Sequence, residues 1–189
     1  MARPRKKNVK RSPGGQSLGE IGYHPEALAN RERALTAAGA PLTITKRELT
    51  PRGWQTVTKP TATDQLAGYT LGVLSLRAAD GITQEQREAG DRWAGIVRAH
   101  AAVMGYRLSV ESPNFIAVPK SESVEAGSEW ALRVRERYRE CYDALTGVAR
   151  VHGYAVIRDT YGVCVENWPI GAFSLGKLRL GLDALIKTG

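Results

Sequence analysis

The sequence predicts an all-α fold: a small bundle of two helical hairpins preceded by a disordered basic N-terminal arm. Over most of the chain after residue 63, apolar residues recur at three- and four-residue spacing, which is the period of amphipathic helices. Residues that favour helix N-caps precede these stretches, and glycines follow several of them. With 189 residues, 42% of them hydrophobic, the chain is long enough to bury a core.

The positive charge of the chain lies in its first third. Residues 1–60 contain 12 Lys and Arg against four Asp and Glu, so they alone carry a charge equal to the net +8 of the whole chain. Residues 61–189 contain 15 residues of each sign and are neutral. This separation is typical of a neutral folded body with a basic segment that binds a polyanion.

Residues 1–22 are predicted to be a disordered arm, because they contain almost no apolar side chain that could stabilise an ordered conformation. Six cations precede Ser12 and are the candidate phosphate-binding residues: Arg3, Arg5, Lys6, Lys7, Lys10 and Arg11. A solubilising tail, or an arm that docks on an acidic protein surface, needs the same charges. The arm therefore indicates the sign of a partner and not its identity.

Residues 23–63 are predicted to hold a short helix and a linker. The helix spans residues 25–38, with Pro25 in its first turn and Gly39 after its end. The linker is rich in threonine and proline and shows no sustained helical or strand period, so it is expected to be extended. Trp54 is interpreted as an anchor that packs this linker on the body.

Residues 64–189 are predicted to form the helical domain. Its first hairpin covers residues 64–104: Asp64 is an N-cap for a helix over residues 65–79, and Asp-Gly ends that helix. Thr83 and Gln86 have the three-residue offset of a capping box, which starts the second helix.

The second hairpin covers residues 129–187. A long helix runs to Val151, a short helix spans residues 154–166, and Ser174 caps a last helix that ends at Lys187. One face of the last helix is predicted to be buried, and it carries Leu175, Leu178, Leu182, Leu185 and Ile186. The opposite, exposed side is expected to carry Lys177, Arg179, Leu180, Asp183 and Lys187, with Gly176 and Gly181. A short helix, a break and an amphipathic helix are compatible with a helix-turn-helix.

The stretch from Arg133 to Gly189 resembles an uncharacterised helix-turn-helix-like domain that closes alphaproteobacterial and phage-encoded regulators. The similarity lies above all in Gly162-Val-Cys-Val-Glu166, in Trp168-Pro169 and in the run from Lys177 to Leu185. The start at Gly81-Ile82-Thr83 and the pair Ala89-Gly90 resemble the opening helix of the same family. The resemblance implies a small helical domain associated with DNA, with Lys177 and Arg179 on its recognition helix and no catalytic residues.

The resulting hypothesis is a non-enzymatic protein that binds nucleic acid, with double-stranded DNA favoured over RNA, of phage or prophage type and with a regulatory or packaging-accessory role. In it, the arm binds phosphates without sequence preference, and Lys177 and Arg179 add orientation or modest specificity. Two alternatives stay open. One is a component of an RNA or ribonucleoprotein assembly, and the other is a protein-interaction adaptor in a phage particle or with the transcription machinery. A homo-oligomer is compatible with each of them.

Neither an enzyme nor a metal or cofactor site is expected, because the sequence holds no nucleotide-binding glycine motif, zinc-ligand spacing or nucleophile elbow. The histidines at 24, 100 and 152 fall in three different elements, and Cys141 and Cys164 are expected to be buried thiols. Free thiols are typical of a reducing compartment, so the expected location is the cytoplasm. No apolar run is long enough for a membrane helix, and no membrane partner is expected.

Overall fold

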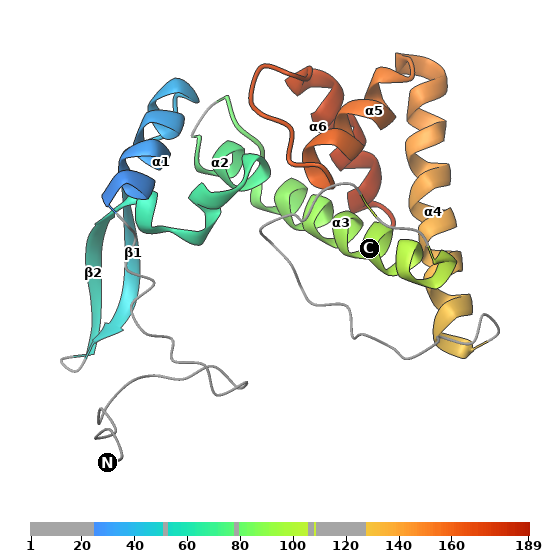
Figure 1. Cartoon of the computed structure of the whole chain (residues 1–189), viewed down its shortest axis with the longest axis horizontal. Coiled ribbons are helices and arrows are strands. Elements are labelled where there is room, and N and C mark those ends of the chain that lie inside the picture. The colour runs from blue at the N-terminus through green and yellow to red at the C-terminus, as the bar shows by residue number, and fades with distance from the viewer. Residues whose placement is uncertain (1–24, 51–52, 78–79, 106–107, 109–127) are drawn as a thin grey trace, which may run out of the picture.

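The computed structural model describes residues 25–50, 53–77, 80–105, 108 and 128–189. The predicted arm therefore lies outside the described residues. The elements follow one another as α1 (Pro25–Ala37), β1 (Thr43–Thr50), β2 (Gly53–Pro60), two single-turn 3₁₀ helices η1 (Thr61–Thr63) and η2 (Gln65–Gly68), α2 (Thr70–Leu76), α3 (Gln84–Met104), α4 (Glu129–His152), α5 (Ala155–Cys164) and α6 (Leu175–Ile186). Figure 1 shows α1 and the two strands on one side of α2, and the helices α3 to α6 on the other side.

The prediction of an all-α fold is wrong. β1 and β2 form a two-stranded antiparallel sheet in the segment expected to be an extended linker, so the molecule is not a bundle of two helical hairpins. Thr43 pairs with Pro60 at one end and Thr50 with Gly53 at the other. Figure 1 shows this hairpin pointing away from the helices.

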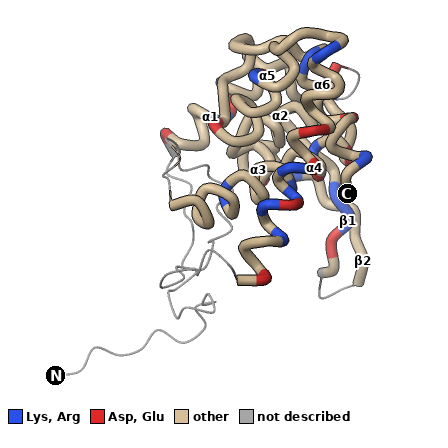
Figure 2. Tube along the Cα trace, turned by 90° about the vertical axis from the view of Figure 1, so that its right-hand side faces the viewer, with Lys and Arg blue, Asp and Glu red and all other residues tan. Residues whose placement is uncertain are grey.

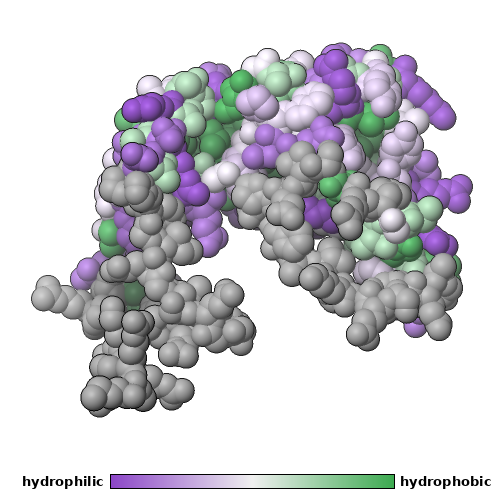
Figure 3. All heavy atoms as spheres, viewed as in Figure 1, coloured by the Kyte–Doolittle hydropathy of each residue, from purple (hydrophilic) through white to green (hydrophobic). Residues whose placement is uncertain are grey.

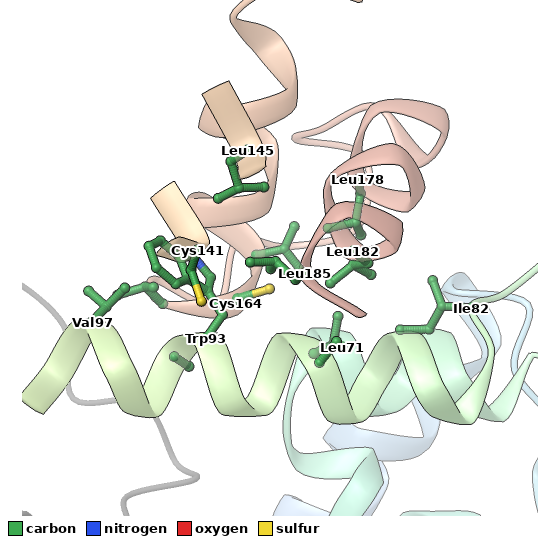
Figure 4. Close-up of a cluster of buried hydrophobic side chains, with 14 of the residues drawn as sticks. Leu71, Ile82, Trp93, Val97, Cys141, Leu145, Cys164, Leu178, Leu182 and Leu185 are labelled. Atoms are coloured by element: carbon green, nitrogen blue, oxygen red, sulfur yellow. The ribbon is translucent and has the colours of Figure 1, made fainter. Parts of the chain in front are cut away.

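Two clusters of buried side chains hold the described part of the chain together. The larger one joins α3, α4, α5 and α6, and Leu71 and Leu74 of α2 belong to it. In Figure 4, Leu182 and Leu185 of α6 lie between that helix and α3, close to Leu71. The smaller cluster joins α1 to η1 and η2 and includes Val73 of α2. Since α2 contributes to both clusters, it connects the N-terminal elements to the helical body.

Two of the three helix starts that the sequence predicts from a side-chain cap, those of α3 and α6, are confirmed. The Thr83 hydroxyl accepts from the Gln86 backbone N–H at 3.1 Å, and the Gln86 side chain accepts from the Thr83 N–H at 3.0 Å, which is a complete capping box at the start of α3. Ser174 caps α6 by accepting from the Lys177 N–H. These two caps fix where α3 and α6 enter the core.

The helix predicted over residues 65–79 is shorter than expected. Asp64 is an N-cap, but it caps η2, and an extended residue, Tyr69, separates η2 from α2. The Thr70 N–H at the start of α2 donates to the Asn167 side chain at 2.8 Å. This contact spans 97 residues of sequence, so the local pattern around residue 70 could not predict it.

Glycines of α5 and α6 lie against bulky side chains and allow close packing around these two helices. A Cβ atom on Gly181 of α6 would collide with the Thr160 side chain of α5, so Gly181 is buried and not on the exposed side as predicted. Gly162 of α5 lies flat against the Trp168 ring, and a Cβ atom there would overlap the ring atoms. Buried Asp159 adds a polar link, since its carboxylate accepts from the Ser174 N–H at 2.8 Å.

Gly162→Ala is expected to lower the free energy of unfolding by about 1–3 kcal/mol, because the Trp168 ring must move to admit the methyl group. Gly147 in α4 is the matched control, since its Cβ position has nothing within 4 Å. There alanine is expected to raise the free energy of unfolding by about 0.5–1 kcal/mol through helix propensity. Urea unfolding of both variants measures the contrast, and a Gly162→Ala protein as stable as the wild type would contradict the close contact.

None of the helices among the described residues combines the length and the apolar character that crossing a membrane requires. Charged residues are spread over the helical body: Figure 2 shows blue and red segments interleaved along it. In the space-filling view of Figure 3, hydrophobic areas on the visible face are small and separated by hydrophilic ones.

Candidate nucleic-acid interface

The hairpin has two unlike faces, because the register sends alternate cross-strand pairs to opposite sides. We call one of them the ribbon face. It carries four pairs: Thr43 with Pro60, Thr45 with Thr58, Arg47 with Thr56, and Leu49 with Trp54. All eight side chains of the ribbon face are exposed, and none of them is a carboxylate.

The distal half of the ribbon face combines a cation with two apolar side chains. Trp54 is 62% exposed and Leu49 is 69% exposed. The Arg47 guanidinium lies over the Trp54 ring at 5.9 Å from its centroid, a diagonal contact between the strands. The interpretation of Trp54 as a packing anchor is therefore wrong: its ring contacts Arg47 across the hairpin and belongs to neither buried cluster.

The opposite face of the hairpin is held by ion pairs. Lys59 on β2 donates to Glu48 on β1 at 2.6 Å, and Lys46 pairs with Asp64 beyond the end of β2. Partial burial raises the pKa of Asp64, but hydrogen bonds from Lys46 and from the Leu66 N–H, together with the Lys46 charge, lower that pKa below its ordinary value. Asp64 thus stays ionised and fixes the base of the hairpin to η2. The two lysines of this face are matched by carboxylates.

None of the described residues of the hairpin belongs to the buried part of either cluster. Outside its own pairing, β1 contacts η1. The hairpin is therefore joined to the rest of the fold at its base, through η1 and through the Lys46–Asp64 pair.

The two predicted DNA-contacting residues of α6 make contacts inside the fold. Lys177 Nζ donates to the His152 carbonyl at the end of α4 at 2.7 Å. The Arg179 guanidinium donates to the Gly81 carbonyl before α3, with Nε at 2.9 Å from the oxygen. Lys177 therefore bridges α6 to α4, Arg179 bridges α6 to the segment before α3, and their contact with DNA stays a prediction. The six predicted residues of the arm, from Arg3 to Arg11, lie outside the described part of the chain.

The helix α6 is surrounded by its neighbours. It packs against α3, α4 and α5; its exposed residues are Gly176 and Asp183, and the C-cap residue Lys187 is exposed on the same side. A recognition helix needs a free polar face of several side chains to reach base edges in the major groove. Only a thin stripe of α6, without net charge, meets this condition.

Among the described residues, no cluster of three or more His, Cys, Asp or Glu is placed to hold a metal ion. Cys141 and Cys164 are buried free thiols, as expected, and burial raises the pKa of Cys164 far above its ordinary value, with a smaller contribution from Asp91. The His100 ring stacks on the Tyr138 ring, with 3.9 Å between the ring centroids. Burial lowers the pKa of His100, and the positive charge of Arg135 lowers it further.

Comparison of the chain with protein-family models, with curated proteins and with solved structures gives no match. The class of the protein is therefore defined by its own fold and surface: a neutral helical body that bears a projecting hairpin with one carboxylate-free face. Sequence reasoning missed this hairpin. The available signals were its threonine content, typical of strands, and the Pro-Arg-Gly sequence between the two segments.

Proposed function

We propose that this protein binds double-stranded DNA without acting as an enzyme. The observation that carries the proposal is the charge distribution: residues 1–60 hold the entire net charge of +8, and the remaining 129 residues are neutral. A polyanion with regularly spaced phosphates is the partner that best complements such a segment.

The same charge distribution suggests a different role for each part of the chain. The cations of the arm neutralise phosphates and supply affinity, and the hairpin provides a folded surface beside them that lacks acids on one face. The helical body, whose surface arginines such as Arg133, Arg137 and Arg139 are paired with carboxylates, acts as a neutral scaffold. With buried free thiols, the protein suits the reducing cytoplasm, where DNA is present.

Fluorescence anisotropy with a labelled duplex and a structured RNA of equal length, over a range of salt, tests the proposal. The affinity for duplex is expected to fall by about 10³-fold between about 0.05 M and 0.2 M salt if six phosphates are neutralised. Deleting residues 2–11 is expected to weaken binding to every duplex and to flatten this salt dependence.

Arg139→Gln is the matched control for the loss of a cation. Arg139 is exposed in α4 and paired with Asp143, so its replacement is expected to leave affinity and salt slope within about twofold. A wild-type protein that ignores duplex DNA at low salt would refute the proposal. A preference for the RNA would favour the ribonucleoprotein alternative instead.

A further inference from the structure

We infer that the ribbon face of the β1–β2 hairpin is the surface that enters the major groove of the duplex, with Arg47 as its principal base-reading residue. The inference rests on the proposed binding to double-stranded DNA and adds the element that contacts the bases. The phosphate contacts proposed for the arm are unchanged by this inference.

The shape of the hairpin fits the groove. Each strand has eight residues, so the ribbon is about 27 Å long at about 3.4 Å per residue. The major groove is about 12 Å wide and admits a two-stranded antiparallel ribbon lying along it. Figure 1 shows that the hairpin extends away from α3 to α6, which leaves its strands projecting from the helical body.

The chemistry of the ribbon face matches the edges of base pairs. Thr45 and Thr58 face each other with their hydroxyl oxygens 3.2 Å apart, and each can exchange this hydrogen bond for one to a base. Threonine methyl groups also suit the methyl group of thymine. Arg47 has the guanidinium fork that pairs with O6 and N7 of guanine, and no carboxylate on its own face competes for it.

Single-stranded nucleic acid fits the ribbon face less well than duplex DNA does. Surfaces that bind single strands stack successive bases on several aromatic rings. The ribbon face carries one aromatic side chain, Trp54, which stands at the distal end next to Leu49. Four threonines and one arginine occupy most of the rest, which favours hydrogen bonding to paired bases over stacking.

The opposite face of the hairpin differs from the ribbon face in its charged side chains. Its lysines, Lys46 and Lys59, are held by Asp64 and Glu48, so this face presents carboxylates along with its cations. Phosphates on the walls of a groove repel such a surface more than the ribbon face. The two faces differ in charge while belonging to the same strands, so variants on each face can be compared directly.

The test compares Arg47→Gln with Lys59→Gln in the full chain. Each variant removes one positive charge from the hairpin, one on the ribbon face and the other on the opposite face. Arg47→Gln is expected to weaken duplex binding about tenfold through lost base contact, and Lys59→Gln by at most about twofold. Anisotropy titrations at about 0.15 M salt measure both, with thermal unfolding as the check that each variant is folded.

Thr58→Glu is the second variant, and it places a carboxylate on the ribbon face without opposing Arg47 directly. It is expected to weaken binding about tenfold or more, since the charge would enter a groove lined by phosphates. Methylation of guanine N7 in the duplex is expected to weaken the wild type and to have less effect on Arg47→Gln.

Equal affinities for Arg47→Gln, Thr58→Glu and the wild type would overturn the inference. So would a change of oligomeric state in Thr58→Glu, measured by sedimentation, with duplex affinity unchanged, because a second copy would then be the occupant of the face. In both cases salt-dependent binding by the wild type would leave the proposed function standing. A wild type that binds no duplex would instead refute the proposed function itself.

Discussion

Leu182→Ala is expected to lower the free energy of unfolding by about 3–5 kcal/mol, the largest stability effect of a single substitution that we predict. Leu182 is fully buried at the centre of α6. It meets α3 where Gly90 lets the helices approach: a Cβ atom on Gly90 would lie 3.0 Å from a Leu182 methyl group, 2.6 Å from Leu71 and 3.1 Å from the Cys164 sulfur. The cavity would therefore open where four helices meet, and urea unfolding monitored by circular dichroism measures its cost.

Leu180→Ala is the matched control, because it removes the same atoms from the same helix at a partly exposed position. It is expected to cost less than about 1.5 kcal/mol, in proportion to the smaller buried area. Equal losses in the two variants would mean that α6 does not pack as described. Since a typical domain is stable by about 5–15 kcal/mol, Leu182→Ala would also increase the unfolded fraction measurably on mild warming.

The packing of α6 could be predicted from the sequence because its signals are local. Ser174 marks its start, and the spacing of Leu178, Leu182 and Leu185 marks its buried face; all three leucines are buried. The same holds for the capping box of α3. The side of Gly181 could not be predicted, since its burial depends on Thr160 in a different helix.

The hairpin could not be predicted from hydrophobic alternation because neither of its faces is a core face. Strand patterns are recognised when one side is apolar, whereas polar and charged side chains occupy both sides here, and Trp54 and Leu49 stand exposed on the ribbon face. What defines the strands is their pairing, from Thr43 with Pro60 to Thr50 with Gly53. Pairing is a contact between segments, and the Pro51-Arg52 sequence between them is only a weak indication of it.

The candidate site, like the hairpin, depends on contacts between distant segments that the sequence alone does not show. Positive charge in the first 60 residues is visible in the sequence, but which cations are matched inside the fold depends on tertiary contacts. Lys177 and Arg179 stand on a helical pattern that suits recognition, yet their partners are the carbonyls of His152 and Gly81, 25 and 98 residues away. The sequence around Arg47 shows no pattern typical of a recognition element. The position of Arg47 on a carboxylate-free face follows from the strand register.

Replacing residues 43–60 with a short glycine-serine turn is expected to reduce duplex affinity by about 10²-fold while leaving the body folded. The cut is feasible because the ends of the hairpin are adjacent: the Thr61 N–H donates to the Leu42 carbonyl at 2.8 Å. No buried member of either cluster is removed, so the midpoint of thermal unfolding is expected to stay close to that of the wild type. Anisotropy and calorimetry on the same preparation measure the two quantities.

The salt dependence of the hairpin-deleted protein separates the two sources of affinity. The excised residues carry net positive charge from Lys46, Arg47, Arg52 and Lys59 against Glu48, whereas the arm keeps its six cations. If the hairpin reads bases, the deletion is expected to remove most discrimination between duplex sequences and to retain most of the salt slope, which reports phosphate contacts. A deletion that flattened the slope without changing sequence preference would assign the hairpin to the phosphates, and Arg47 would then be one cation among several.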